Sequence, residues 1–280
     1  MQLVLRSTIL DLTEPKVMGV LNVTPDSFSD GGLHASVEAA VAHGERMAAE
    51  GAAIIDVGGE STRPGAPAVS VEEEIRRVVP VIERLAARVG VPVSVDTSKP
   101  EVMRAAVDAG AQMINDVRAL AVPGALVTAA ASGAAVCLMH MRGEPASMQD
   151  EPRYADVVAE VRDYLAARIA ACEVAGIPRA RLCLDPGIGF GKLPGHNLAL
   201  LANLREIGDP SLPVLVGVSR KSLVGIITGR PPGERLAGSV AFAALAVARG
   251  ASIIRAHDVP ETVDAVKVAV ALRSAAAGGS

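Results

Sequence analysis

The chain has 280 residues, enough for one large domain or two small ones. Its formal net charge of −4 argues against a general nucleic-acid binder. Its three cysteines include no CxxC pair, so neither a disulfide framework nor a zinc site is indicated. No charged-then-apolar leader opens the sequence and no apolar stretch approaches the length of a membrane helix. We therefore expect a cytoplasmic protein without a membrane segment.

The predicted elements begin with a short hairpin in residues 1–16, whose apolar segments 3–5 and 9–12 would cover the lower end of the strands after it. Short apolar runs then recur along the chain, and each is followed by a polar residue, a loop and a helix. The runs are 17–21, 52–55, 91–95, 111–114, 134–139, 182–184, 214–218 and 253–254, and the polar residues that end them are Asn22, Asp56, Asp96, Asn115, His140, Asp185, Ser219 and Arg255. The patterns Ser70-x-x-Glu73 and Ser98-x-x-Glu101 predict helix starts of the capping-box type.

Strands that alternate with helices predict an α/β fold with a parallel sheet. An aliphatic core suits such a sheet, because hydrophobic residues make up 50% of the chain and aromatic residues only 2%. Closing the sheet leaves no exposed edge, so we predict a (β/α)8 TIM barrel as a single domain over residues 1–280, with a frayed tail at 275–280. An open, doubly wound sheet is the alternative architecture.

In a barrel of this kind, the polar residues that end the strands meet at one mouth, where active sites lie. The alternative for any one of them is that it caps the following helix. Two loops, 22–32 and 58–67, are long for a compact domain and predict lids or binding loops, with a flexible insertion as the alternative. The glycine-rich segment 185–192 is not a Walker A loop, because Leu193 stands where Ser or Thr belongs. His140 is interpreted as a packed residue at the rim.

These motifs resemble the signatures of one family, the dihydropteroate synthases, and most of all those of Gram-negative bacteria. The resemblance covers essentially the whole chain, and the signatures occur in the family's order. They are 18–32 (MGVLNVTPDSFSDGG), 56–65 (DVGGESTRPG), 94–100 (SVDTSKP), 114–116 (IND), 184–192 (LDPGIGFGK), 218–222 (VSRKS) and 255–258 (RAHD). This similarity implies a transferase of folate biosynthesis, which joins a pterin pyrophosphate to p-aminobenzoate and is a target of sulfonamide inhibitors.

The resemblance also implies the site. A pterin pocket is expected to contain Asp96, Asn115, Asp185 and Lys221, with Met139, Val20 and Val117 beside the ring. Arg255 and His257 are expected to hold the pyrophosphate, and Asn22 to position Mg²⁺ on it. p-Aminobenzoate is expected among Thr62, Arg63, Pro64, Phe190, Ser219, Lys221 and Ser222, with Phe28 closing above it. Asp96, Asp185, Lys221, Arg255 and His257 are expected to act in catalysis.

Two other functions remain open from the sequence. One is a pterin-binding methyltransferase of the same barrel superfamily, and the other is a pterin-binding paralogue without activity. The two long loops and the pair Arg255-x-His257 argue against the first. Intact Asn22, Arg63 and Lys221 argue against the second. The family also implies a homodimer formed through helices on the outside of the barrel.

Overall fold

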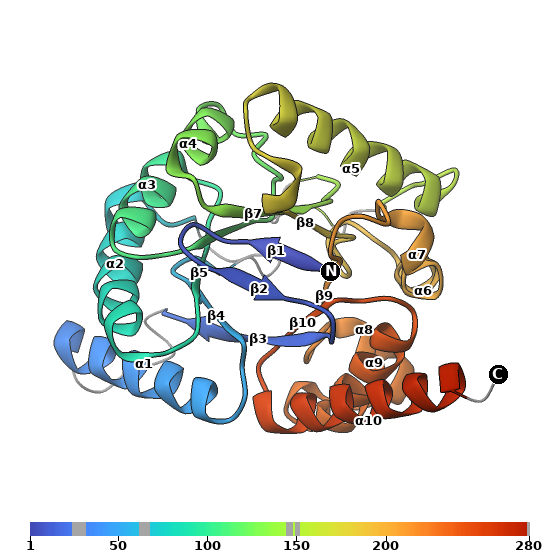
Figure 1. The fold of residues 1–280 in the computed structure, drawn as a ribbon. Coiled ribbons are helices and arrows are strands. Elements are labelled where there is room, and N and C mark those ends of the chain that lie inside the picture. The colour runs from blue at the N-terminus through green and yellow to red at the C-terminus, as the bar shows by residue number, and fades with distance from the viewer. Residues whose placement is uncertain (24–31, 62–67, 144–147, 149–151, 279–280) are drawn as a thin grey trace.

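The computed structural model describes residues 1–23, 32–61, 68–143, 148 and 152–278 (Figure 1). Within these residues, eight parallel strands form one sheet in the order β8-β7-β6-β5-β4-β3-β10-β9. Their bounds are β3 Lys16–Asn22, β4 Ile54–Gly58, β5 Val93–Asp96, β6 Met113–Asp116, β7 Ala135–Met139, β8 Leu182–Asp185, β9 Leu215–Gly217 and β10 Ile253–Ala256.

The two edges of this sheet meet and close it. Leu184 of β8 forms a parallel bridge with Val214, just before β9, and the Leu184 N–H donates to Pro213 O at 2.9 Å. Figure 1 shows the helices arranged as a ring around the strands. The predicted (β/α)8 barrel is therefore confirmed, and the open-sheet alternative is excluded.

The helices of the described residues lie between successive strands, as the repeat predicts. Two 3₁₀ turns, η2 and η3, accompany them. The bounds are α1 Gly32–Ala49, α2 Val71–Arg88, α3 Pro100–Asp108, α4 Ala125–Ser132, α5 Val157–Val174, η2 Arg179–Arg181, α6 Pro194–Ala202, α7 Leu204–Ile207, α8 Ser222–Thr228, η3 Pro232–Glu234, α9 Leu236–Ala248 and α10 Val259–Gly278. None of the helices described is both long and apolar enough to cross a membrane.

The barrel interior has an apolar lower end and a polar upper end. Side chains alternate along each strand between the interior and the surrounding helices. The lower inward positions form one buried apolar cluster, which consists of Met18, Ile54, Met113, Ala135, Cys137, Cys183, Leu215 and Ile253 together with Leu3, Leu5 and Leu12. Two residues further along, the inward positions carry polar groups in most strands, which places the polar groups at the carboxyl ends of the strands.

The N-terminal hairpin closes the lower end. β1 (Gln2–Val4) pairs antiparallel with β2 (Ile9–Asp11). Leu3, Leu5 and Leu12 are buried in the lower cluster, while Ile9 points to solvent. The hairpin predicted in residues 1–16 is confirmed, and its leucines complete the apolar filling of the barrel.

The helix starts agree only in part with the sequence. Ser70 caps α2 as predicted, since its Oγ accepts from Glu73 N–H at 3.2 Å. The capping box predicted at Ser98 is wrong. α3 begins at Pro100 with Lys99 at the N-cap, and the Ser98 hydroxyl donates to Asp116 instead. A buried carboxylate needs such donors more than an exposed helix end does.

The C-terminal helix α10 runs to Gly278, so it continues into the segment 275–280 that the sequence predicted to fray. Alanine has the highest helix propensity, and residues 275–277 are all alanine, which accounts for the extension. Residues 279–280 lie outside the described part.

Leu3→Ala should lower the free energy of unfolding by about 2–5 kcal/mol, because it opens a cavity in the fully buried lower cluster. Ile9→Ala is the matched control in the same hairpin, since Ile9 is 59% exposed, and it should change stability by less than about 0.5 kcal/mol. Urea denaturation measures both. Equal losses in the two variants would contradict the role of the hairpin as a plug.

Candidate functional site

The polar residues of the upper barrel come together, as the strand ends predicted. Asp56 of β4, Asp96 of β5, Asn115 of β6 and Arg255 of β10 form one hydrogen-bonded chain. All four occupy strand positions whose side chains face the barrel interior. The sequence expected such residues after the strands, whereas the structure places them within the strands' last two or three residues.

Arg255 joins two carboxylates. Its Nε donates to Asp56 Oδ2 at 2.7 Å, and its Nη2 donates to Asp96 Oδ2 at 2.7 Å. The Asp56 side chain has no exposed surface. Burial of a charge carries a large desolvation penalty, and Arg255 offsets it for both partners. Burial alone would lower the pKa of Arg255, but the two carboxylates outweigh it and raise that pKa.

Asp56 also sets the orientation of Asn115. The Asn115 Nδ2 donates to Asp56 Oδ2 at 2.9 Å. An ionised carboxylate can only accept, so the amide nitrogen must face Asp56. The amide oxygen of Asn115 is therefore left to accept a hydrogen bond from a ligand.

Asp185, Lys221 and Phe190 form the second half of the site around the turn that follows β8. Asp185 Oδ1 accepts from Gly187 N–H at 2.7 Å. The Lys221 Nζ donates to Ile188 O at 2.6 Å and lies 4.7 Å from the centre of the Phe190 ring. Gly217 lies beside it, where a Cβ would be in ordinary van der Waals contact with Lys221 Nζ at 3.7 Å.

Burial shifts the pKa values of the ionisable groups at this mouth. It raises the pKa of Asp96 to about 7, with Arg255 opposing the rise and Asp56 adding to it. It also raises the pKa of Asp185, which Lys221 opposes. Burial lowers the pKa of Lys221 to about 8, against the attraction of Asp185. Clustered shifts of this kind are typical of functional sites.

The remaining predicted residues that the structure describes also lie at this mouth. Ser219 Oγ accepts from the His257 N–H at 3.2 Å and lies 3.1 Å from His257 Nδ1. Ser222 is exposed at the first position of α8. Met139 is buried at the end of β7, and its strand position faces the interior. Phe28, Thr62, Arg63 and Pro64 lie outside the described residues.

Asn22 is the last residue of β3 and lies on the same face of the strand as Met18, so its side chain faces the barrel interior. The described part of the chain contains no group of three or more His, Cys, Asp or Glu side chains that could hold a metal ion. Mg²⁺ takes oxygen ligands, usually keeps several waters and binds through one or two carboxylates plus substrate phosphate. The Asn22 amide offers one oxygen, and waters and a diphosphate would have to supply the other ligands.

The set of site residues predicted from the sequence omitted Asp56 and Lys192. Asp56 ends an apolar run as Asp96 and Asp185 do, and this shared position was the signal that could have included it. Lys192 carried no such signal, because it closes a glycine-rich loop and not a strand. The structure places its ammonium group 2.9 Å from Nδ1 of His140. His140 is buried, in agreement with its interpretation as a packed residue.

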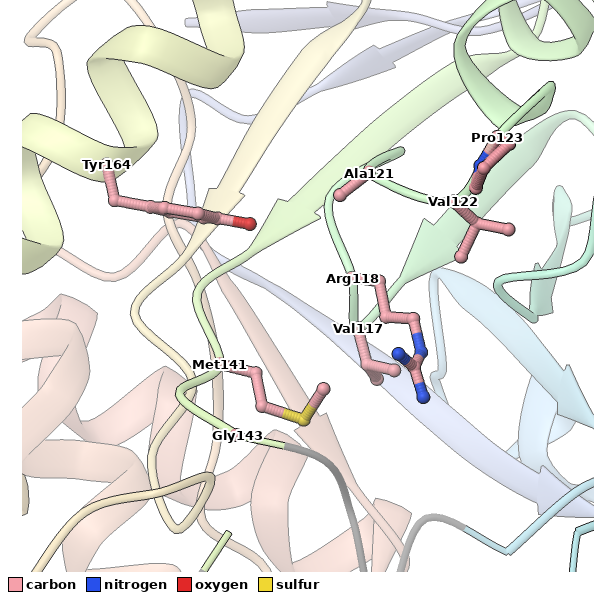
Figure 2. Close-up of a pocket in the computed structure, with 8 residues that line it drawn as sticks. All are labelled: Val117, Arg118, Ala121, Val122, Pro123, Met141, Gly143 and Tyr164. Carbon is pink, nitrogen blue, oxygen red and sulfur yellow. The ribbon is translucent and has the colours of Figure 1, made fainter.

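A separate pocket of about 290 Å³ lies beside the mouth, between the loops that follow β6 and β7 (Figure 2). Tyr164 reaches it from α5, while Val117 comes from the loop after β6 and Met141 from the loop after β7. The lining residues are Val117, Arg118, Ala121, Val122, Pro123, Met141, Gly143 and Tyr164. Of the residues predicted around the pterin, only Val117 lines this pocket.

Comparison with known proteins decides the family. The model of the family described as pterin binding enzyme matches residues 18–257. The chain is 57% identical over 275 residues to the dihydropteroate synthase of Escherichia coli K12, and the match covers 98% of each chain. The chain belongs to the dihydropteroate synthase family. Members of this family are transferases, and the resemblance stated from the sequence is confirmed.

Solved structures of the family agree with the fold. A Yersinia pestis dihydropteroate synthase in complex with a sulfonamide drug superposes with a TM-score of 0.93 at 53% identity, covering 98% of this chain and 100% of that chain. A Xanthomonas albilineans dihydropteroate synthase in complex with 7,8-dihydropteroate gives a TM-score of 0.89 at 55% identity, with coverage of 98% and 99%.

Asp56→Asn should lower the pKa of Asp96 below its value of about 7. The substitution removes a repelling charge and leaves Arg255 with a single carboxylate partner. Carbon-13 NMR titration of labelled aspartate measures this pKa, and Asp96→Asn identifies the signal. Asp264→Asn, at a surface position of α10 whose side chain is 78% exposed, is the control and should leave Asp96 unchanged. An unaltered Asp96 pKa in Asp56→Asn would contradict the shared ion pair.

Proposed function

We propose that this chain condenses 6-hydroxymethyl-7,8-dihydropterin pyrophosphate with p-aminobenzoate to give 7,8-dihydropteroate and pyrophosphate. The observation that carries the proposal is the meeting of Asp96, Asn115, Asp185 and Lys221 at one barrel mouth. The two solved relatives support it, since one holds 7,8-dihydropteroate and the other a sulfonamide drug.

The pterin would be recognised through its polar edge. The free oxygen of Asn115 and the carboxylate of Asp185 accept from N–H groups of the ring, and Lys221 donates to a ring acceptor. Met139 is an apolar neighbour for the ring at the end of β7. Burial lowers the pKa of Lys221 to about 8, so its side chain is an ammonium group below about pH 8. Binding of the pterin through this donor therefore weakens as the pH rises through that value.

The pyrophosphate would lie at the end of β10, against Arg255 and His257. The Arg255 guanidinium has five N–H donors, and its bonds to Asp56 and Asp96 leave others to meet phosphate oxygens. His257 is oriented through Ser219. When Mg²⁺ is bound through Asn22, it would neutralise charge on the leaving group.

In the reaction, the bond between the pterin methylene carbon and the pyrophosphate oxygen breaks, and its electron pair leaves with pyrophosphate. The amine nitrogen of p-aminobenzoate forms the new bond to that carbon and loses one proton. Asp96 and Asp185 stabilise positive charge that develops on the pterin. Among the described residues, p-aminobenzoate would contact Phe190, Ser219, Lys221 and Ser222.

The purified protein should release pyrophosphate only when the pterin pyrophosphate, p-aminobenzoate and Mg²⁺ are all present. Asp185→Asn should weaken pterin binding by about 10- to 100-fold, because an amide donor then faces the donors of the ring. Asp264→Asn should keep full activity. Coupled pyrophosphate assays and calorimetry measure these effects. Release that does not depend on p-aminobenzoate would reject the proposal.

The proposal includes a cytoplasmic homodimer. Cys137, Cys172 and Cys183 are all free and buried, which suits a reducing compartment. α8, α9 and α10 lie together on one side of the barrel in Figure 1. Their large exposed apolar side chains are Ile226, Ile227, Leu236, Leu245, Val268 and Leu272. An apolar group of this kind on neighbouring helices favours burial against a second copy.

Leu245→Glu should convert the protein to monomer, because it would place a charge in the proposed interface. Light scattering of the wild type should give about twice the chain mass of 28.6 kDa, and of the variant a single chain mass. Val174→Glu on α5, on the opposite side of the barrel and 90% exposed, should remain dimeric. A wild-type protein that is monomeric at micromolar concentration would reject the dimer.

A further inference from the structure

Lys192 is a buried cation outside the proposed reaction. It lies between β8 and α6 and is 2% exposed. Its Nζ donates to Gly187 O at 2.9 Å, Phe190 O at 3.0 Å and His140 O at 3.2 Å, and lies 2.9 Å from His140 Nδ1. A methionine would fill similar space without the desolvation penalty of an ammonium group. The charge therefore calls for a role that an apolar side chain does not provide.

The contacts of Lys192 determine the form of the turn that follows Asp185. Gly187, Gly189 and Gly191 all have positive φ, and the turn lies directly against the backbone that follows β7. A Cβ on Gly187 would lie 1.9 Å from His140 O. The turn directs the carbonyl groups of Gly187 and Phe190 toward the Lys192 ammonium group, which holds them together.

The other side of the same turn contacts the site. Gly187 N–H donates to Asp185, Ile188 O accepts from Lys221, and the Phe190 ring lies against the Lys221 ammonium group. The carbonyl groups thus alternate between two cations. Those of residues 187 and 190 bind Lys192, and that of residue 188 binds Lys221.

We propose that Lys192 is a positioning residue, whose ammonium group fixes the turn 187–190 and thereby holds Asp185 and Lys221 in the arrangement that binds the pterin. This inference rests on the proposed function. In this arrangement the neutral His140 ring accepts at Nδ1 and carries its proton on Nε2, and one of the three N–H groups of Lys192 is shared between Nδ1 and the carbonyl oxygen of His140. The Tyr164 ring packs edge-on against it at 4.9 Å, and Tyr154 donates to Gly191 O at 2.8 Å, which supports the same turn from outside.

The charges around Lys192 and His140 agree with the contact between them. Burial, followed by the charges of Lys192 and Arg142, lowers the pKa of His140 to about 3, so the ring accepts at neutral pH. Burial lowers the pKa of Lys192 to about 7, while Asp185 opposes this and Lys221 and Arg142 add to it. Lys221, Lys192 and Arg255 are the cations that oppose the rise in the pKa of Asp185. Removing the charge of Lys192 therefore raises the pKa of Asp185 further, which a packing role alone would not do.

The test is calorimetry with 6-hydroxymethylpterin as the probe, from about pH 5 to about pH 8. Lys192→Met should weaken binding about 10- to 100-fold below about pH 7, where Lys192 carries its charge, and the loss of affinity on acidification should begin at a higher pH than in the wild type. Lys192→Arg keeps a cation, so its acid limb should stay at the wild-type pH. Lys267→Met is the control, since it removes a lysine from a surface position whose side chain is 73% exposed, and it should bind as the wild type.

Wild-type affinity in Lys192→Met would overturn the inference. It would also be overturned if the probe lost affinity on acidification at the same pH in Lys192→Met as in the wild type. Failure of the wild type to bind the probe would instead reject the proposed function. Nitrogen-15 NMR of the wild type decides the case if Lys192→Met does not fold. The ring of His140, assigned by its loss in His140→Gln, should be neutral with an unprotonated Nδ1, and a proton on Nδ1 would overturn the inference.

Discussion

The pairing of Arg255 with Asp56 and Asp96 is the interaction on which the upper half of the barrel depends. Closing the sheet brings the inward side chains of all strands toward one axis, so their charges lose solvent together. An isolated buried carboxylate is unfavourable, and two adjacent carboxylates are more so. One guanidinium donates to an oxygen of each carboxylate at 2.7 Å, and the same Asp56 oxygen, Oδ2, fixes the amide of Asn115, while Asp56 Oδ1 is buried without a hydrogen-bond partner among the described residues. The groups that would bind a charged and polar ligand therefore also stabilise one another through hydrogen bonds.

The lower half of the barrel supplies the stability for this arrangement. Its inward positions are apolar and are covered by the leucines of the N-terminal hairpin. Successive inward positions of one strand are only two residues apart, and the change from apolar to polar falls between two of them. In β3, Met18 and Val20 are followed by Asn22, and in β10, Ile253 is followed by Arg255. Hydrophobic burial at one end stabilises a structure that holds desolvated charge at the other, which is a common division of stability and function in barrels.

The turn after β8 supplies a part of the site that the strands do not provide. The turn after β8 has three glycines with positive φ, and at Gly187 and Gly191 the backbone after β7 also approaches too closely for a Cβ. Such a turn offers carbonyl groups in opposite directions, and buried cations occupy both sides of it. The glycines therefore permit the conformation of the turn after β8, and the lysine ammonium groups stabilise it.

The sequence by itself determined the barrel, because eight apolar runs ending in polar residues have few other solutions, and it predicted the hairpin from the two short apolar segments 3–5 and 9–12. It also indicated Asp96, Asn115, Asp185 and Arg255 as strand-end groups of one mouth. Only the tertiary structure decided their pairing. Asp56 of β4 became the common partner of Asn115 and Arg255, which lie two strands away on either side, because closure of the barrel directs all three side chains toward one axis. Ser98 left its expected helix cap for Asp116 because a buried carboxylate has the stronger need of a donor. Lys192 gave no periodic signal, since its environment is made of carbonyl groups and a histidine that are brought together by loops from two different strands. Local pattern reports which face a residue occupies, whereas the partner of a buried charge depends on the three-dimensional arrangement of the whole barrel.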